Sequence, residues 1–149
     1  MGDDHDFEAI WREQGPAIWR AVLAYGGGRR DIADDAVAEA FARVMERGTE
    51  IRDPVAYLYR VAFRIAAADL RSATSELEEL AIEDPEPLVD LLTAMRSLSP
   101  AERAAVYLHY RADMPVRDIA KILDTTSAAV RVRLMRGRRR LANLLRDDA

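Results

Sequence analysis

The sequence predicts an all-α protein built from two small helical domains that are joined by an acidic linker. Half of the 149 residues are apolar, which is enough to build a core, and there are only 7 glycines and 6 prolines. The long stretches between them repeat their apolar residues at helical spacing, which favours helix over sheet. Charge is divided along the chain. The net charge is -4, yet residues 98–149 carry 11 basic and 6 acidic residues while residues 72–97 carry 1 and 7.

The composition also excludes several classes of function. With no cysteine, the chain has no disulfides, cysteine-based zinc sites or thiol nucleophiles. The start of the chain is acidic, and no apolar run approaches the roughly 18 residues of a membrane span. We therefore expect a cytoplasmic protein. The neighbours Asp34 and Asp35 would point about 100° apart on a helix, so they are poor candidates for an acid/base pair. His5 and His109 have no spaced partner, so no metal, cofactor or enzymatic activity is expected.

The N-terminal domain, residues 1–71, should contain three helices. The first carries apolar residues at helical spacing and should kink or split at Gly15 and Pro16, then end at the glycines of residues 26–28. The second should run from about Asp31 to Arg47 with carboxylates in its first turn, where the helix dipole favours them. The third should start with Asp53 as N-cap and Pro54 at the first helical position and run to about Arg71. Four aromatic residues should anchor one small core: Trp11, Trp19, Phe41 and Phe63.

Residues 72–87 carry six carboxylates and two prolines, and we interpret them as a linker. It is either a solvated spacer or a segment that masks the basic C-terminal domain. That domain, residues 88–149, should open with a helix near 88–96. A capping box from Ser99 to Glu102 should start the next helix. A short helix after Pro115, a turn at residues 124–126 and a long helix from Thr126 or Ser127 then have helix-turn-helix spacing.

The last helix carries the strongest functional signal. A buried stripe is predicted at Val130, Leu134, Gly137 and Leu141, because these positions lie within about 60° of one another at 100° per residue. Six arginines and no acid occupy residues 131–140. A purely solvated face usually alternates both signs of charge, so this pattern favours contact with nucleic acid. The candidate DNA contacts are Ser127, Ala128, Arg131, Val132, Arg133, Arg136, Arg138 and Arg139.

Five segments together resemble the bacterial extracytoplasmic-function (group IV) sigma factors. Residues 98–103, 118–123 and 130–138 are similar to that family's region 4, a pattern that other helix-turn-helix regulators share. Greater specificity comes from residues 34–44, which resemble region 2.2, and residues 53–62, which resemble the start of the promoter-melting helix. The resemblance covers almost the whole chain.

The resemblance implies a non-enzymatic transcription initiation factor that binds core RNA polymerase and double-stranded and melted promoter DNA. The second helix would dock on the β′ clamp helices through Asp34, Asp35, Glu39 and Arg43, and region 4 would meet the β flap. The -10 element would be bound through Arg52, Tyr57, Arg60 and Arg64, and the -35 element through the residues of the last helix. An anti-sigma factor is implied as a further partner.

Two departures and two rival functions accompany this interpretation. Ala36, Ala38 and Ala40 stand where the family commonly has Leu, Gln and Thr, which predicts a weaker polymerase contact. Arg64 stands where Asn is common, which changes the expected base preference at the -10 element. The alternatives are a helix-turn-helix regulator that acts without polymerase, and a sigma-like interaction protein that does not initiate. A stand-alone regulator usually dimerises, and the sequence has no sustained heptad seam.

Overall fold

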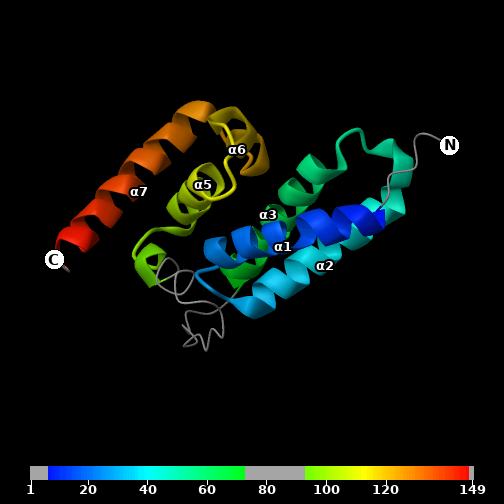
Figure 1. Ribbon diagram of the computed structural model, residues 1–149, viewed down its shortest axis with the longest axis horizontal. Coiled ribbons are helices and arrows are strands. Elements are labelled where there is room, and N and C mark those ends of the chain that lie inside the picture. The colour runs from blue at the N-terminus through cyan, green and yellow to red at the C-terminus, as the bar shows by residue number, and fades with distance from the viewer. Residues whose placement is uncertain (1–6, 73–92, 148–149) are drawn as a thin grey trace.

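A computed structural model of the chain describes residues 7–72 and 93–147, and these residues form helices and turns without a strand (Figure 1). The helical elements are α1 (Phe7–Tyr25), α2 (Arg30–Arg47), the short 3-10 helix η1 (Gly48–Glu50), α3 (Pro54–Ser72), α5 (Pro100–Tyr110), α6 (Val116–Ile122) and α7 (Ser127–Asp147). The predicted all-α class is confirmed. Residues 93–95 are helical, while most of the expected linker and of the helix near 88–96 lies outside the described residues.

Of the predicted kink or split at Gly15 and Pro16, the split is wrong, because α1 runs as one helix through Pro16. A proline ring disfavours helical geometry at the preceding residue mainly by clashing with its Cβ and backbone. Gly15 has no Cβ, which removes part of that clash. The helix ends at Tyr25 as expected, and Gly27 and Gly28 then take positive φ angles of 67° and 92°.

Helices α1, α2 and α3 pack against one another and form the N-terminal core. Asp53 caps α3 as predicted, because its Oδ1 accepts a hydrogen bond of 3.1 Å from the Ala56 N–H. Phe41 and Phe63 are buried. The expectation for Trp11 is only partly met, since half of its surface is exposed while its ring packs edge-on against Phe41 with centroids 4.5 Å apart.

Helices α5, α6 and α7 form the second unit, in which α7 lies against both of the others. The predicted capping box is present, since the Ser99 hydroxyl accepts from the Glu102 N–H and the Glu102 carboxylate accepts from the Ser99 N–H. Gly137 of α7 lies directly against α5. A Cβ placed on Gly137 would stand 2.7 Å from Cγ2 of Val106, so this glycine lets the two helices approach closely.

The two halves of the chain touch through α1 with α5 and through α3 with α6 (Figure 1). The Arg103 guanidinium of α5 binds the end of α1, with Nε and Nη2 donating to the Tyr25 carbonyl at 3.1 and 2.9 Å. Its Nη1 donates to the Leu98 carbonyl at 2.9 Å. Tyr59 of α3 and Tyr107 of α5 are buried nearby, and burial raises the pKa of both hydroxyls. One continuous apolar core therefore spans both halves.

None of the described helices is both long enough and apolar enough to cross a membrane.

Candidate nucleic-acid interface

The start of α7 is built by a short turn after α6. Asp124 adopts a left-handed conformation with φ 53°, and the Thr125 N–H donates back to the Ala120 carbonyl at 2.9 Å. The Thr126 hydroxyl then accepts from the Ala129 N–H at 3.1 Å, so Thr126 is the cap and the predicted start of this helix is confirmed. These contacts fix the direction in which the first turns of α7 leave the unit.

The predicted buried stripe of α7 is also confirmed. Val130 and Leu134 are buried, Gly137 packs on α5, and Leu141 is half-buried. This seating turns Ala128, Arg131 and Val132 outward at the start of the helix and Arg136 and Arg139 outward further along. Ser127 is half-buried at the first position.

The arginines of α7 divide into two groups. Within the described chain, neither a hydrogen bond nor an ion pair engages the exposed Arg131, Arg136 and Arg139. They are therefore available to an external anion. Arg138 differs, because its Nη1 donates to the Tyr110 hydroxyl at 2.8 Å. Arg133 is half-buried and its charge acts on the Tyr25 hydroxyl.

Arg140, which was not among the candidate DNA contacts, binds residues of the helix-turn-helix unit itself. Its Nη1 donates to the Ser97 carbonyl at 3.3 Å and lies 3.6 Å from the Glu102 carboxylate. Glu102 is buried, so it connects the capping box of α5 to α7. No local sequence pattern predicts the contact of Arg140 with Glu102, because it joins residues 38 positions apart.

A second basic surface lies between the end of α2 and α3. A pocket of about 430 Å³ is lined by Arg43, Glu46, Arg47, Tyr57, Arg60, Val61 and Arg64. The structure thus brings together Tyr57, Arg60 and Arg64 of the candidate -10 set, whereas exposed Arg52 is not part of the lining. Arg43, which the resemblance assigned to the polymerase contact, also lines this pocket.

Sequence reasoning missed Arg47 in this pocket. Its guanidinium lies 5.8 Å from the centroid of the Tyr57 ring, within range of a cation–π interaction. Arg43 and Arg47 are four residues apart on α2 and so share a face, which is the signal that could have found it. An aromatic ring beneath several cations can hold a nucleotide base and its phosphate.

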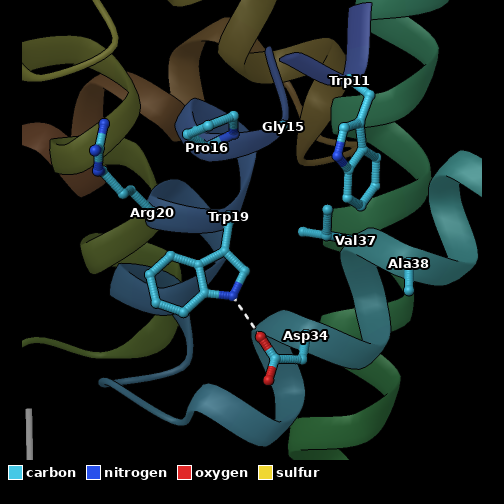
Figure 2. A pocket seen from close by; sticks show the side chains of 8 residues that line it. All are labelled: Trp11, Gly15, Pro16, Trp19, Arg20, Asp34, Val37 and Ala38. Carbon is cyan, nitrogen blue, oxygen red and sulfur yellow. Dashed lines mark hydrogen bonds between the residues drawn. The ribbon is translucent and has the colours of Figure 1, made fainter. Parts of the chain in front are cut away.

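Three acidic residues of α2, Asp34, Asp35 and Glu39, are exposed to solvent, and each contacts a different neighbouring side chain. Asp34 accepts a hydrogen bond of 2.7 Å from the Trp19 indole (Figure 2), and Glu39 pairs with Arg43 at 3.3 Å. Asp35 stands beside Asp69 of α3. Partial burial, together with the hydrogen bond and charge of Asp35, raises the pKa of Asp69. Asp34, Asp35 and Glu39 therefore form one exposed acidic surface on α2.

The helix-turn-helix unit lies over part of α3. A pocket of about 290 Å³ between them is lined by Arg60, Arg64 and Arg71 of α3 and by Ile122, Leu123 and Asp124 at the end of α6 and its turn, together with other residues. The Asp124 carboxylate thus borders the same pocket as three arginines of α3. We call this arrangement closed, because α5 and α6 pack against α1 and α3, and in it the turn before α7 borders the arginines of α3.

Comparison with known proteins connects this geometry to a family. Residues 88–141 match the family model of sigma-70, region 4. The extracytoplasmic-function RNA polymerase sigma factor BldN of Streptomyces coelicolor is 27% identical over 99% of this chain and 63% of its own length. The chain is a homologue of the extracytoplasmic-function sigma factors. A second relative, the sigma factor SigJ of Mycobacterium tuberculosis, is 29% identical over 72% of the chain and 41% of its own length. This sigma-factor homologue thus spans less than two thirds of either curated relative.

Two solved structures share the fold of this sigma-factor homologue. The sigma factor RpoE, in complex with the anti-sigma factor NepR from Bartonella quintana, superposes with a TM-score of 0.82 over 97% of this chain and 99% of that chain, at 21% identity. CnrH, in complex with the cytosolic domain of CnrY, superposes with a TM-score of 0.73 over 96% and 89%, at 22% identity. Because these superpositions cover nearly the whole chain, the closed arrangement of the two halves is also similar.

Proposed function

We propose that this chain is a transcription initiation factor that binds core RNA polymerase in the cytoplasm and directs it to promoters through their -10 and -35 elements. The observation that carries the proposal is the face of α7, where three exposed arginines without partners in the described chain follow a capped N-terminus with small side chains. The similarity to sigma factors along the whole chain supports a polymerase-bound role over a stand-alone regulator. The polymerase performs the chemistry.

The -35 element is read by the first turns of α7 in the major groove. Arg131 is placed to reach a guanine edge, and the small Ala128 admits close approach and contact with a thymine methyl group. Arg136 and Arg139, one and two turns further along, are suited to phosphates, which position the helix without reading sequence. Arg138 joins them with the N–H groups that it does not use on Tyr110.

The -10 element is received by the pocket between α2 and α3. Tyr57 offers a stacking surface for an unpaired base, and Arg47, Arg60 and Arg64 surround it with positive charge. The exposed Arg52 lies at the start of the same region and contacts the backbone of the melted strand. Residues 1–71 and 88–149 act in this scheme as separate DNA-binding domains.

The acidic surface of α2, formed by Asp34, Asp35 and Glu39, docks on a basic helix pair of the polymerase β′ subunit. Complementary charge steers such an encounter and fixes its register. Region 4 meets the β flap through the side of its unit that DNA leaves free.

Use of both DNA surfaces at once requires the closed arrangement to open. The two promoter elements are about 25 base pairs apart, or about 85 Å of duplex at 3.4 Å per base pair, whereas α3 and α6 touch each other here. DNA of this length is too stiff to fold back cheaply. An anti-sigma partner, like the NepR that is bound to RpoE, acts by holding the closed arrangement.

The salt dependence of DNA binding tests the role of α7. If about six phosphates are neutralised, the affinity of the polymerase complex for a -35 duplex falls with a log-log slope near -5. Arg136→Ala should weaken binding about equally on all sequences and reduce the slope by about 1. Arg131→Ala should also relax the preference for one base pair, by about 1–3 kcal/mol of discrimination. Fluorescence anisotropy at several salt concentrations measures both effects.

The matched control is Arg12→Ala, which removes an exposed arginine from α1. It should leave both affinity and slope unchanged. DNA binding that is unaltered in Arg131→Ala and Arg136→Ala would rule out α7 as the reading helix.

A further inference from the structure

The pocket between α3 and the turn before α7 has chemistry that the DNA surfaces do not account for. Its volume is about 290 Å³, and we refer to it as the junction pocket. Three arginines of α3 line it, namely Arg60, Arg64 and Arg71. Arg60 and Arg64 also line the pocket of Tyr57, whereas Arg71 does not. Contact with the -10 element therefore leaves the position of Arg71 unexplained.

The three arginines of the junction pocket share one face of α3. At 100° per residue, positions 60, 64 and 71 fall within about 40° of one another. Ala67 lies on the same face, and its small side chain leaves room between the guanidinium groups. All three arginines are exposed, and none of them forms a hydrogen bond or ion pair within the described chain. Like charges on one helix face repel each other, so an anion among them would stabilise this face.

Two more arginines act on the same pocket. Tyr25 belongs to its lining, and the charges of Arg71, Arg103 and Arg133 act on the Tyr25 hydroxyl. Burial raises the pKa of this hydroxyl, and the three guanidinium groups oppose that rise. The hydroxyl is therefore protonated at neutral pH and can donate a hydrogen bond to an anion.

The positive charge of the junction pocket is not balanced by the described residues that line it. Asp124, the one carboxylate among them, is exposed and forms no ion pair with the arginines of α3. Phe63, Ile122 and Leu123 add apolar surface to the lining. The pocket thus combines a net positive charge with apolar walls.

This combination suits a phosphate group with more than one negative charge. A guanidinium presents paired N–H groups that match two phosphate oxygens, and such charge-assisted hydrogen bonds are strong. The volume of the junction pocket is at the small end of the range for ligand sites. It therefore suits a diphosphate or triphosphate, either free or as the phosphate tail of a nucleotide.

We infer that the junction pocket binds a diphosphate or triphosphate group through Arg60, Arg64 and Arg71. The anion lies between the two halves of the chain, because Leu123 and Asp124 border the same pocket. A ligand that binds only the closed arrangement stabilises it. The site itself goes beyond the proposed function. One consequence rests on that function: an anion on Arg60 and Arg64 would oppose binding of the -10 element.

Calorimetric titration of the purified chain with inorganic pyrophosphate tests the site. We expect one site per chain with a Kd below about 1 mM, and binding of sulfate at equal ionic strength at least about tenfold weaker. Arg71→Gln should weaken pyrophosphate binding about tenfold, because it removes charge-assisted hydrogen bonds. The matched control is Arg117→Gln, which removes an exposed arginine of α6 outside the lining and should change the Kd less than about twofold. Absence of saturable binding, or equal effects of the two substitutions, would overturn the inference.

A substitution in the other half of the chain tests whether the anion lies between the halves. Asp124→Asn removes a negative charge from the junction pocket and keeps a residue that tolerates the left-handed conformation at φ 53°. It should strengthen pyrophosphate binding about threefold. An unchanged Kd would mean that the anion binds α3 alone, and the stabilisation of the closed arrangement would then be wrong.

Titration with ADP distinguishes the two sources of the phosphate group. Tighter binding of ADP than of pyrophosphate would assign the site to a nucleotide, and equal or weaker binding would assign it to a free polyphosphate. These titrations contain neither polymerase nor DNA, so their outcome is separate from the proposed function. Pyrophosphate binding without transcription activity would remove only the consequence for the -10 element. Transcription activity without pyrophosphate binding would exclude only the junction pocket as a ligand site.

Discussion

Replacement of Gly137 by alanine is expected to destabilise the helix-turn-helix unit by about 1–2 kcal/mol. Alanine in place of glycine normally stabilises a helix by about 1 kcal/mol. Here the added methyl group would stand 2.7 Å from Cγ2 of Val106, a short buried side chain that cannot swing aside. Overpacking of this kind costs about 1–3 kcal/mol, and the cost should exceed the gain. Thermal and denaturant unfolding measure the change.

Two controls make the result specific. Gly15→Ala in α1 places its methyl group at an ordinary 3.8 Å from Trp11, so its stability should change by less than about 1 kcal/mol. Val106→Ala added to Gly137→Ala should recover part of the loss, because it removes the opposing methyl groups. A stabilised Gly137→Ala variant would show that α5 and α7 do not pack as closely as described.

Loss of the Arg103 guanidinium should open the closed arrangement. Arg103→Ala removes both hydrogen bonds to the Tyr25 carbonyl and the one to the Leu98 carbonyl. Buried acceptors left without a partner cost about 1–3 kcal/mol, and the half-buried Tyr25 carbonyl at the contact between α1 and α5 should bear the lower part of that cost. The chain has no cysteine, so labels on Ala42→Cys and Ala142→Cys report the distance between α2 and α7 cleanly.

The expected result is a longer mean distance and a lower unfolding temperature for Arg103→Ala. Arg96→Ala is the matched control, since it removes an exposed arginine close enough for its charge to act on Arg103. If both variants give the same distance as the unmodified chain, Arg103 does not hold the two halves together.

Local sequence signals predicted most helix boundaries in the described residues. The capping box from Ser99 to Glu102, the cap at Asp53 and the glycines after Tyr25 are encoded within a few residues, and each appears as expected. The stripe through Val130 and Leu134 was equally readable, because helical spacing alone decides which face is buried.

The wrong predictions concern residues whose neighbours change the usual behaviour of that residue type. Pro16 is a helix breaker in most contexts, but the preceding glycine lets α1 continue. Trp11 was expected in the core because it is large and apolar, yet it lies at the edge of a groove between α1 and α2 that small residues leave open (Figure 2). The size and hydropathy of a side chain do not show whether a neighbouring helix covers it.

The sequence predicted that a DNA-binding and a polymerase-binding surface exist, but it predicted less well which residues make up each of them. The arginine face of α7 follows from the sequence, but the tie between Arg138 and Tyr110 joins residues 28 positions apart. Arg43 was assigned by resemblance to the polymerase surface, and the structure adds that it lines the pocket of Tyr57 and Arg60. The contact of Arg103 with Tyr25 crosses 78 positions and has no local signal. Long-range pairs of this kind depend on how the helices pack.

Run-off transcription tests the central proposal most directly. Bacterial core RNA polymerase and a promoter from this protein's own operon are combined with and without the purified chain. The proposal predicts a transcript from one start site that depends on the chain and disappears when Arg131 and Arg136 are both changed to alanine. Absence of a transcript while the chain binds the promoter DNA would contradict it and favour a regulator or a sigma-like protein that does not initiate.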